Sequence, residues 1–179
     1  YEMQRSLVGS EMCIRDRPVM AEVLSGFDCS IRVLNSDAIL EQTGMKAVQL
    51  GVVEKPIVND SVDRVTLRED RLVLAGDPHG VWMVREHGSG VRYYTDLYFK
   101  TVGFMPSRMI EVANNAAIGA ALAAGFGCSL VSAAAVPAGV PTRELGDEFV
   151  RRFYALVPRS GLTPGQRELA GRVIAALRG

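Results

Sequence analysis

The chain has 179 residues, of which 48% are hydrophobic and 22% charged, and its 20 basic residues balance 20 acidic ones. This composition is ordinary for a soluble globular domain or for two small lobes. The balanced charge and scattered arginines argue against a nucleic-acid-binding surface on this chain, because such surfaces need clustered cations.

The first stretch, "SLVGSEMCIRDR" at residues 6–17, has neither a helical stripe of apolar residues nor a strand alternation. We expect no core element there. Residues 7–16 can be back-translated codon by codon into the adapter with a transposase mosaic end that is used in sequencing libraries. We therefore predict that residues 1–17 form a non-native, adapter-derived segment, that the natural chain starts near Pro18, and that it has lost whatever preceded it.

The next elements alternate between helix and strand. The patterns predict a helix over 18–27, a strand over 29–35, a helix over 36–45 and a strand over 47–56 that is buried on both faces. This order predicts a parallel sheet with covering helices.

The pattern changes at residues 62–78, which predict two strand-like runs joined by a tight polar turn at Glu69 and Asp70. A second alternating unit follows: a strand, a glycine loop and a helix over 81–103, a strand over 107–113, a helix over 114–125, and a strand over 128–136 that ends in a short helical turn. Residues 137–148 have a loop-like composition. The chain then closes with a strand over 149–158 and a helix that a capping box from Thr163 to Gln166 opens.

Cysteine usage and apolar runs exclude several classes of site. With Cys13 assigned to the adapter, Cys29 and Cys128 each lie in an apolar run, which favours buried free thiols in a reducing compartment. No metal-ligand spacing exists, and we predict neither a metal nor a cofactor. The longest apolar stretch, residues 116–136, is interrupted by glycines and does not indicate a membrane span.

The most informative segment is "REHGSGVR", residues 85–92, where Gly88 and Gly90 flank Ser89 between a strand and a helix. Backbone N–H groups at such a helix start, together with the macrodipole, favour an anion. The alternative is a tight turn in which Ser89 caps its own helix.

Other polar residues share this placement just past the end of a strand, where open α/β sheets bind ligands. They are Asn35, Ser36, Glu54, Asn114 and Asn115. For the two residues at 114 and 115, plain helix capping is the alternative.

Catalysis has little support in the sequence. His79 and His87 have no paired nucleophile, and an apolar strand is a poor place to stabilise a Cys128 thiolate. The aromatic residues between 93 and 99 indicate helix packing. We therefore do not expect an enzyme.

Three segments, "REHGSGVR", "IEVANNAAIGAALAAGFGCSLVSAAAV" and "RRFYALVPRSGLTPGQRELAGRVIAAL", resemble the effector-binding (substrate-binding) domain of LysR-type transcriptional regulators. The resemblance runs from Pro18 to the C-terminus. It implies an α/β fold of the type 2 periplasmic-binding-protein kind, with two α/β lobes, two crossovers near Pro78 and Gly146, and a ligand cleft between the lobes. Lobe 1 would comprise residues 18–78 plus 146–179 and lobe 2 residues 79–145, and the family's helix-turn-helix DNA-binding domain is absent.

The resemblance also implies the function. A small-molecule effector, for which the loop favours an anion or carboxylate, would bind in the cleft and control transcription through a conformational shift. The ligand-binding residues would be Ser89, Gly90, Arg92, Asn114 and Asn115 from lobe 2, with Asn35, Ser36 and Glu54 from lobe 1. The full-length protein would be a cytoplasmic homodimer or homotetramer without membrane contact, which binds DNA only through the missing domain. The alternative is a secreted solute-binding protein of an ABC-type transporter with the same fold.

The chain departs from the family pattern in places. Val91 stands where a threonine usually follows the glycine loop, and Gln49 replaces an acidic residue. The family's first strand should precede Pro18, so we expect its ladder hydrogen bonds to be lost and a purified fragment to be unstable. The segment "SLVGS" is the candidate to occupy the gap in the sheet, and a soluble fragment that melts cooperatively would contradict the expected instability.

Overall fold

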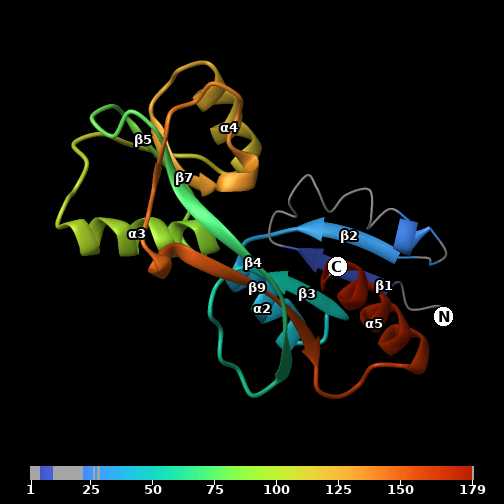
Figure 1. The fold of residues 1–179 in the computed structure, drawn as a ribbon. Helices are drawn as coiled ribbons and strands as arrows, with labels where there is room; N and C mark the ends of the chain where they lie inside the picture. The colour runs from blue at the N-terminus through green and yellow to red at the C-terminus, as the bar shows by residue number, and fades with distance from the viewer. Residues whose placement is uncertain (1–4, 10–21, 26, 28, 179) are drawn as a thin grey trace. The chain divides into compact units, whose positions relative to one another are not determined.

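A computed structural model describes residues 5–9, 22–25, 27 and 29–178, and it divides into two compact units (Figure 1). Unit 1 comprises Tyr1–Arg68 and Arg152–Gly179, and unit 2 comprises Glu69–Arg151. Two long strands, β4 (Val62–Gly76) and β9 (Val150–Pro158), run through both boundaries. The start of the helix predicted from Pro18 lies outside the described residues, of which 22–24 are helical.

Unit 1 is a sheet with a helix on each face. Its elements are β1 (Arg5–Gly9), β2 (Cys29–Val33), α2 (Ser36–Gly44), β3 (Leu50–Val53), part of β4, most of β9, and α5 (Pro164–Arg178). The strands follow the order β2-β1-β3-β9, with β1 parallel to both neighbours and β9 antiparallel to β3. The predicted alternation of helix and parallel strand is confirmed for this unit.

Alternate residues of β3 separate the two cores of unit 1. Leu50 and Val52 pack with the α5 stripe that Leu169 and Val173 begin, whereas Val53 packs with Ile39 of α2. Both faces of the strand are therefore buried, as the sequence predicts. The capping box of α5 is also present, because the Gln166 side chain accepts from the Thr163 N–H at 2.9 Å.

The strand at residues 5–9 corrects the expectation that no element of the core sheet forms in this stretch. These residues form β1 between β2 and β3, with Leu7 opposite both Ile31 and Leu50. Most of "SLVGS" therefore occupies the gap left by the family's first strand, and a ladder is present there because its hydrogen bonds use only backbone N–H and C=O groups. The instability of a purified fragment stays a prediction. Residues 10–17, the rest of the predicted adapter, lie outside the described residues, and the origin of the segment stays a prediction.

Unit 2 repeats the arrangement of a sheet between helices. Its elements are part of β4, β5 (Trp82–Val84), α3 (Gly90–Val102), β6 (Met109–Glu111), α4 (Asn115–Ala123), β7 (Cys128–Ser132), η2 (Ala133–Ala135), β8 (Thr142–Glu144) and η3 (Asp147–Phe149). The strand order is β4-β7-β5-β6, and β8 also pairs with β4. Helices α3 and α4 cover opposite faces of these strands (Figure 1).

Aromatic packing fixes α3 to its face of the sheet. Trp82 is fully buried, and its ring stacks on Tyr98 at a centroid distance of 5.6 Å and meets Phe99 edge-on at 4.8 Å. The interpretation of this cluster as helix packing is confirmed, although Tyr93 is 43% exposed.

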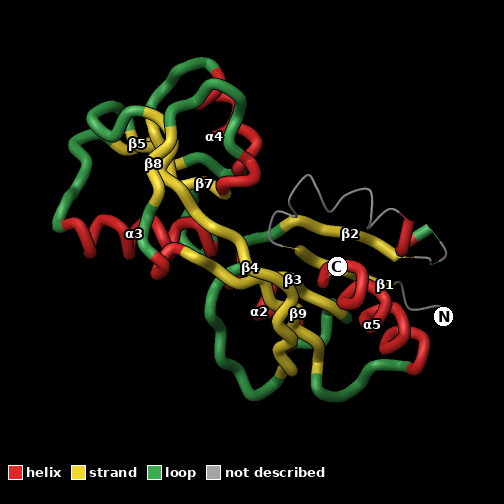
Figure 2. Tube along the Cα trace, in the orientation of Figure 1, coloured by secondary structure: helices red, strands yellow, loops and turns green. Residues whose placement is uncertain are grey.

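The turn predicted at Glu69 and Asp70 is wrong, because β4 continues through both residues as one strand (Figure 2). The Asp70 side chain is 13% exposed, and each of its oxygens accepts a bond from a distant residue. Ser132 Oγ donates at 2.7 Å to Oδ1, and Arg151 Nε donates at 2.7 Å to Oδ2. An acidic residue is unfavourable in a strand by itself, and these partners stabilise it there.

The loop predicted over 137–148 is also wrong in part. Within it, Thr142–Glu144 form β8, which pairs antiparallel with Val73–Ala75 of β4, and Asp147–Phe149 form a short 3-10 helix. The side chains of β8 are all exposed, so no apolar alternation marks it in the sequence. The strand forms because its backbone N–H and C=O groups pair with those at the edge of β4.

Candidate functional site

The glycine loop of unit 2 places Ser89 at the start of α3. Gly88 turns the chain with a φ of +90°, a conformation that favours glycine, and Ser89 is the N-cap residue. The Ser89 side chain makes no capping bond, so the capping alternative is wrong for its hydroxyl group. The residue is only 3% exposed, and its Oγ has no hydrogen-bond partner among the described residues. A buried, unsatisfied hydroxyl is costly, which marks this position as a candidate ligand contact.

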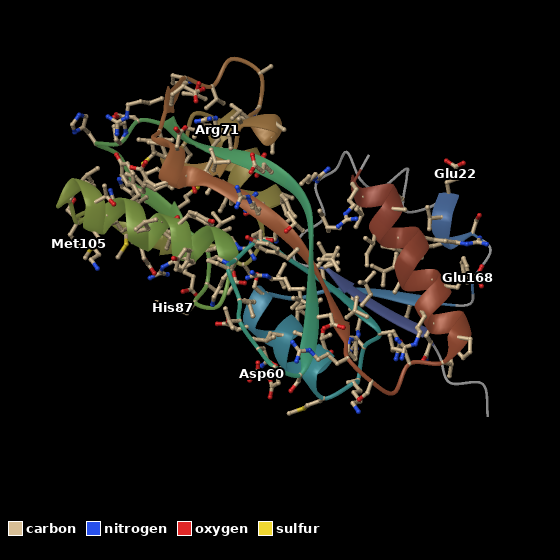
Figure 3. All side chains as sticks on the ribbon, turned by 60° about the horizontal axis from the view of Figure 1, so that its bottom comes forward. Glu22, Asp60, Arg71, His87, Met105 and Glu168 are labelled. Carbon is tan, nitrogen blue, oxygen red and sulfur yellow. The ribbon has the colours of Figure 1, made fainter. Side chains whose placement is uncertain are left out.

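Two arginines frame this loop. Arg85, at the end of β5, is 4% exposed and forms a bidentate pair with Glu86, with Nε–Oε2 and Nη2–Oε1 distances of 2.9 and 3.0 Å. Arg92, in the first turn of α3, donates from Nε to Asp96 at 2.8 Å and from Nη1 to the Arg85 carbonyl at 3.0 Å. His87 stands on the loop that leads into α3, and Met105 lies just beyond the other end of the helix (Figure 3).

The two asparagines at the start of α4 have different roles. Asn114 is the N-cap, since its Oδ1 accepts from the Ala117 N–H at 2.8 Å, which confirms the capping interpretation for this residue. Asn115 is half-buried, and its Oδ1 accepts from Arg85 Nη1 at 3.0 Å. Arg85 therefore connects the glycine loop to the start of α4, a contact that the sequence analysis did not identify.

Unit 1 contains a similar helix start. Asn35 caps α2, with its Oδ1 accepting from the Ala38 N–H at 2.9 Å. Ser36 is fully buried, and its Oγ has no partner in the described part of the chain. Glu54 follows β3 and is 3% exposed, and the neighbouring Lys55 pairs with Asp37 of α2 at 2.5 Å. The Lys55–Asp37 pair thus joins the segment after β3 to the first turn of α2. Each of the three candidates lies just past the end of a strand, and their role in ligand binding stays a prediction.

The described residues do not support the other kinds of site that the sequence raised: a cysteine nucleophile, a metal site or a membrane span. Cys128 is fully buried, and burial, with a smaller effect of Asp77, raises the pKa of its thiol from 9.0 to about 12. A thiol with so high a pKa is a poor nucleophile at neutral pH. Among the residues that the structure describes, no group of three or more His, Cys, Asp or Glu side chains could hold a metal ion. The described helices include none that is long and apolar enough to cross a membrane.

Comparisons with known proteins identify the family and the fold of this chain. The LysR substrate binding domain family matches residues 23–178. The chain is 25% identical over 144 residues to an uncharacterized HTH-type transcriptional regulator of Staphylococcus xylosus, a match that covers 77% of this chain and 53% of that protein. It is 28% identical over 120 residues to the HTH-type transcriptional regulator CbbR of Rhodospirillum rubrum, covering 60% and 40%. The chain thus spans about half the length of the curated relatives that it matches.

A solved structure shows the same fold. The regulatory domain of CcmR from Synechocystis PCC6803, in complex with 2-PG, matches with a TM-score of 0.78 and 21% identity, over 98% of this chain and 97% of that one. This match confirms the predicted α/β fold of the type 2 periplasmic-binding-protein kind. Because the family match covers most of its length, the chain belongs to the LysR substrate binding domain family.

Proposed function

We propose that this chain is the effector-sensing domain of a cytoplasmic LysR-type transcriptional regulator. Binding of a small molecule would change the conformation of the regulator and thereby control transcription. The observation that carries the proposal is the pair of buried hydroxyl groups on Ser36 and Ser89, one in each unit, each at a helix start that follows a strand. The curated relatives, which are described as helix-turn-helix regulators, support the same function. The chain acts in this proposal as a sensor and not as an enzyme.

The proposed ligand contacts follow from the two helix starts. In unit 1 they are Asn35, Ser36 and Glu54, and in unit 2 they are Ser89, Gly90 and Asn115. Asn114 and Arg92 belong to the same region, where Asn114 caps α4 and Arg92 holds the loop. The predicted lobes, residues 18–78 with 146–179 and residues 79–145, form part of the same proposal.

The partners of the full-length protein are also proposals. We expect a small anionic or carboxylate effector, a helix-turn-helix domain that binds DNA, and a homodimer or homotetramer. Exposed apolar side chains on β6, where Met109 is 47% and Ile110 43% exposed, support self-association of unit 2. Sedimentation of the full-length protein as a monomer would contradict this part of the proposal.

A ligand screen tests the sensing function. Compounds that raise the melting temperature of the chain should raise it less in Ser36→Ala and Ser89→Ala, because each variant loses a hydrogen bond worth about 1.5–3 kcal/mol with a charged group. Ser160→Ala is the matched control, since Ser160 is exposed, lies away from both helix starts in the sequence, and its hydroxyl accepts a 3.1 Å bond from Lys46 Nζ. Ligand shifts that are equal in all four proteins would exclude both serines from the site.

The genomic sequence upstream of the Pro18 codon separates the regulator from the transporter receptor. An adapter-free long read that joins a helix-turn-helix reading frame to this domain supports the regulator. A secretory signal peptide in that position overturns it in favour of a solute-binding protein. A continuous genomic reading of "SLVGSEMCIRDR" would refute the predicted adapter origin of residues 6–17.

A further inference from the structure

In unit 1, the first half of β4 has an open edge. Strand β4 pairs with β9, β7 and β8, and the last two pair with Leu72–Gly76 and Val73–Ala75. Among the residues that the structure describes, β9 is therefore the strand that lies beside residues 62–68, although β4 runs on as one continuous strand (Figure 2). The other edge of this stretch has no strand beside it in the described part of the chain, so its backbone groups there are open to a partner.

Arg64 and Thr66 direct their backbone groups to this open edge. The N–H of Arg159, which directly follows β9, donates to the Ser61 carbonyl at 3.3 Å, so Ser61 faces β9. Neighbouring residues of a strand direct their N–H and C=O groups to opposite sides, so residues 64 and 66 face away from β9. Both residues are exposed, and the Thr66 carbonyl accepts a 3.0 Å bond from the Nε atom of Arg178 on α5. A side chain outside the sheet thus occupies one acceptor of the edge.

Arginine side chains surround the edge. Arg64 and Arg178 are exposed, and Arg68 is half-buried. The guanidinium carbon of Arg64 lies 4.7 Å from the centre of the Tyr154 ring, and its Nη1 donates to the Ile57 carbonyl at 2.9 Å. These contacts fix the position of Arg64 beside the strand. A planar guanidinium held in this way is suited to bind a carboxylate through two parallel hydrogen bonds.

The charge of this edge favours an acidic partner. Residues 62–68, together with Arg159 and Arg178, contain four arginines and one acidic residue, Asp63, which pairs with Arg159 at 3.0 Å. One further acidic residue flanks the stretch on each side, at positions 60 and 69. A second copy of the same edge would place arginine opposite arginine, which destabilises a strand pair. Charged residues protect an edge against unselective pairing, and here they select a segment of opposite charge.

We propose that the open edge of β4 binds an extended, acidic segment of a partner protein by strand addition. The backbone of the segment pairs with Arg64 and Thr66, and its carboxylates bind Arg64, Arg68 and Arg178. The Thr66 carbonyl exchanges its bond with Arg178 for an N–H of the partner, and the released guanidinium binds a carboxylate. Side chains on one face of a strand are two residues apart, so the acidic residues of the partner stand at alternate positions. This interaction is a further function beside the proposed effector sensing.

Amide chemical-shift titrations of the whole chain test the proposal with two short peptides, one that alternates threonine with glutamate and one that alternates threonine with lysine. We expect the glutamate peptide to shift the amide signals of Arg64 and Thr66 saturably, and the lysine peptide to leave them unchanged. The control is Arg172→Gln, which removes another exposed arginine of unit 1, one that pairs with Glu168 within α5. This variant should bind the glutamate peptide as tightly as the wild type.

Thr66→Pro separates strand addition from attraction between charges. Proline removes the outward N–H but keeps every arginine, and an edge strand tolerates proline at such a position. We expect this variant to bind the glutamate peptide about tenfold more weakly, as for the loss of a hydrogen bond. If it binds the peptide as tightly as the wild type, strand addition is overturned.

The combined variant Arg64→Glu and Arg178→Glu tests the charge requirement, and it changes only exposed side chains. We expect it to bind the lysine peptide more tightly than the glutamate peptide. If it keeps the preference for glutamate, or if neither peptide shifts the edge signals of the wild type, the acidic partner is overturned. Shifts of the same signals on raising the protein concentration alone would overturn the proposal in favour of pairing between two copies. Effector sensing stands in each case, because none of these edge residues is a candidate ligand contact.

Discussion

Replacement of Asp70 by asparagine is expected to lower the free energy of unfolding of unit 2 by about 3 kcal/mol. Asp70 accepts 2.7 Å bonds from Ser132 and Arg151, and the exposed fractions of the Asp70 and Arg151 side chains are 13% and 5%. Removal of one partner of a buried pair costs about 3–5 kcal/mol, because the other charge stays buried and loses an ion pair that offset its desolvation. We expect the lower end of this range, since Asp70 keeps some contact with solvent and asparagine can still accept from Ser132.

Urea unfolding followed by tryptophan fluorescence measures this loss directly. Trp82 is the one tryptophan of the chain and is fully buried in the core of unit 2, so its emission reports on this unit. The control is Asp147→Asn, which breaks a 3.5 Å pair with Arg71. The Asp147 side chain is 97% exposed, so this change should leave the urea midpoint of unfolding unchanged. If Asp70→Asn unfolds at the same urea concentration as Asp147→Asn, the buried pair does not stabilise β4 and our reasoning is refuted.

Three further predictions concern local packing, capping and pH. Gly51→Ala should destabilise unit 1 by about 1–3 kcal/mol, because a Cβ there would lie 2.5 Å from a methyl group of α2, whereas Gly171→Ala, with open space around it, should not destabilise it in urea unfolding. Asn114→Ala should cost about 1 kcal/mol through loss of a cap, whereas Ser89→Ala should cost less in the same assay, and equal costs would restore the capping role of Ser89. Burial in the folded state raises the pKa of the Cys128 thiol from 9.0 to about 12. The protonated thiol therefore contributes its full stability below pH 9, and this contribution is lost as the pH rises from 9 to 12. Cys128→Ala should reduce this alkaline loss of stability in pH-dependent melting.

The elements that could be predicted from the sequence are those whose signals are local. Helix α5 is an example, since Leu169, Val173 and Leu177 form its buried stripe and the capping box from Thr163 to Gln166 begins it. The cap of α4 by Asn114 is another. In each case the residues that stabilise the element lie within one or two helical turns of one another, so their spacing carries the information.

The elements that the sequence analysis missed depend on partners that are distant along the chain. By its local sequence, Asp70 is predicted to be a turn residue. It lies in a strand because Ser132 and Arg151, 62 and 81 positions away, donate hydrogen bonds to its side chain. Strand β8 forms because the edge of β4 lies next to it, although its own side chains are exposed. Neither partner could be identified from composition or periodicity within a short window.

The candidate site divides in the same way. The glycine loop and both helix starts were predicted, because glycine, serine and asparagine after a strand are local signals. Whether the Ser89 hydroxyl caps α3 depends on its side-chain conformation and burial, which the sequence does not encode locally. Arg85 was missed, although a charged residue directly after the buried strand "WMV" is itself a signal, because a buried arginine requires partners such as Glu86 and Asn115.

Strand β1 shows the limit of side-chain patterns most clearly. Residues 5–9 lack the pattern of a core element, yet they pair in parallel with β2 and β3 in the interior of the unit 1 sheet. The hydrogen bonds of a parallel ladder join backbone groups, so any segment that can extend between two strands satisfies them, whatever its side chains. A natural strand and an adapter-derived segment would therefore pair in the same way at residues 5–9.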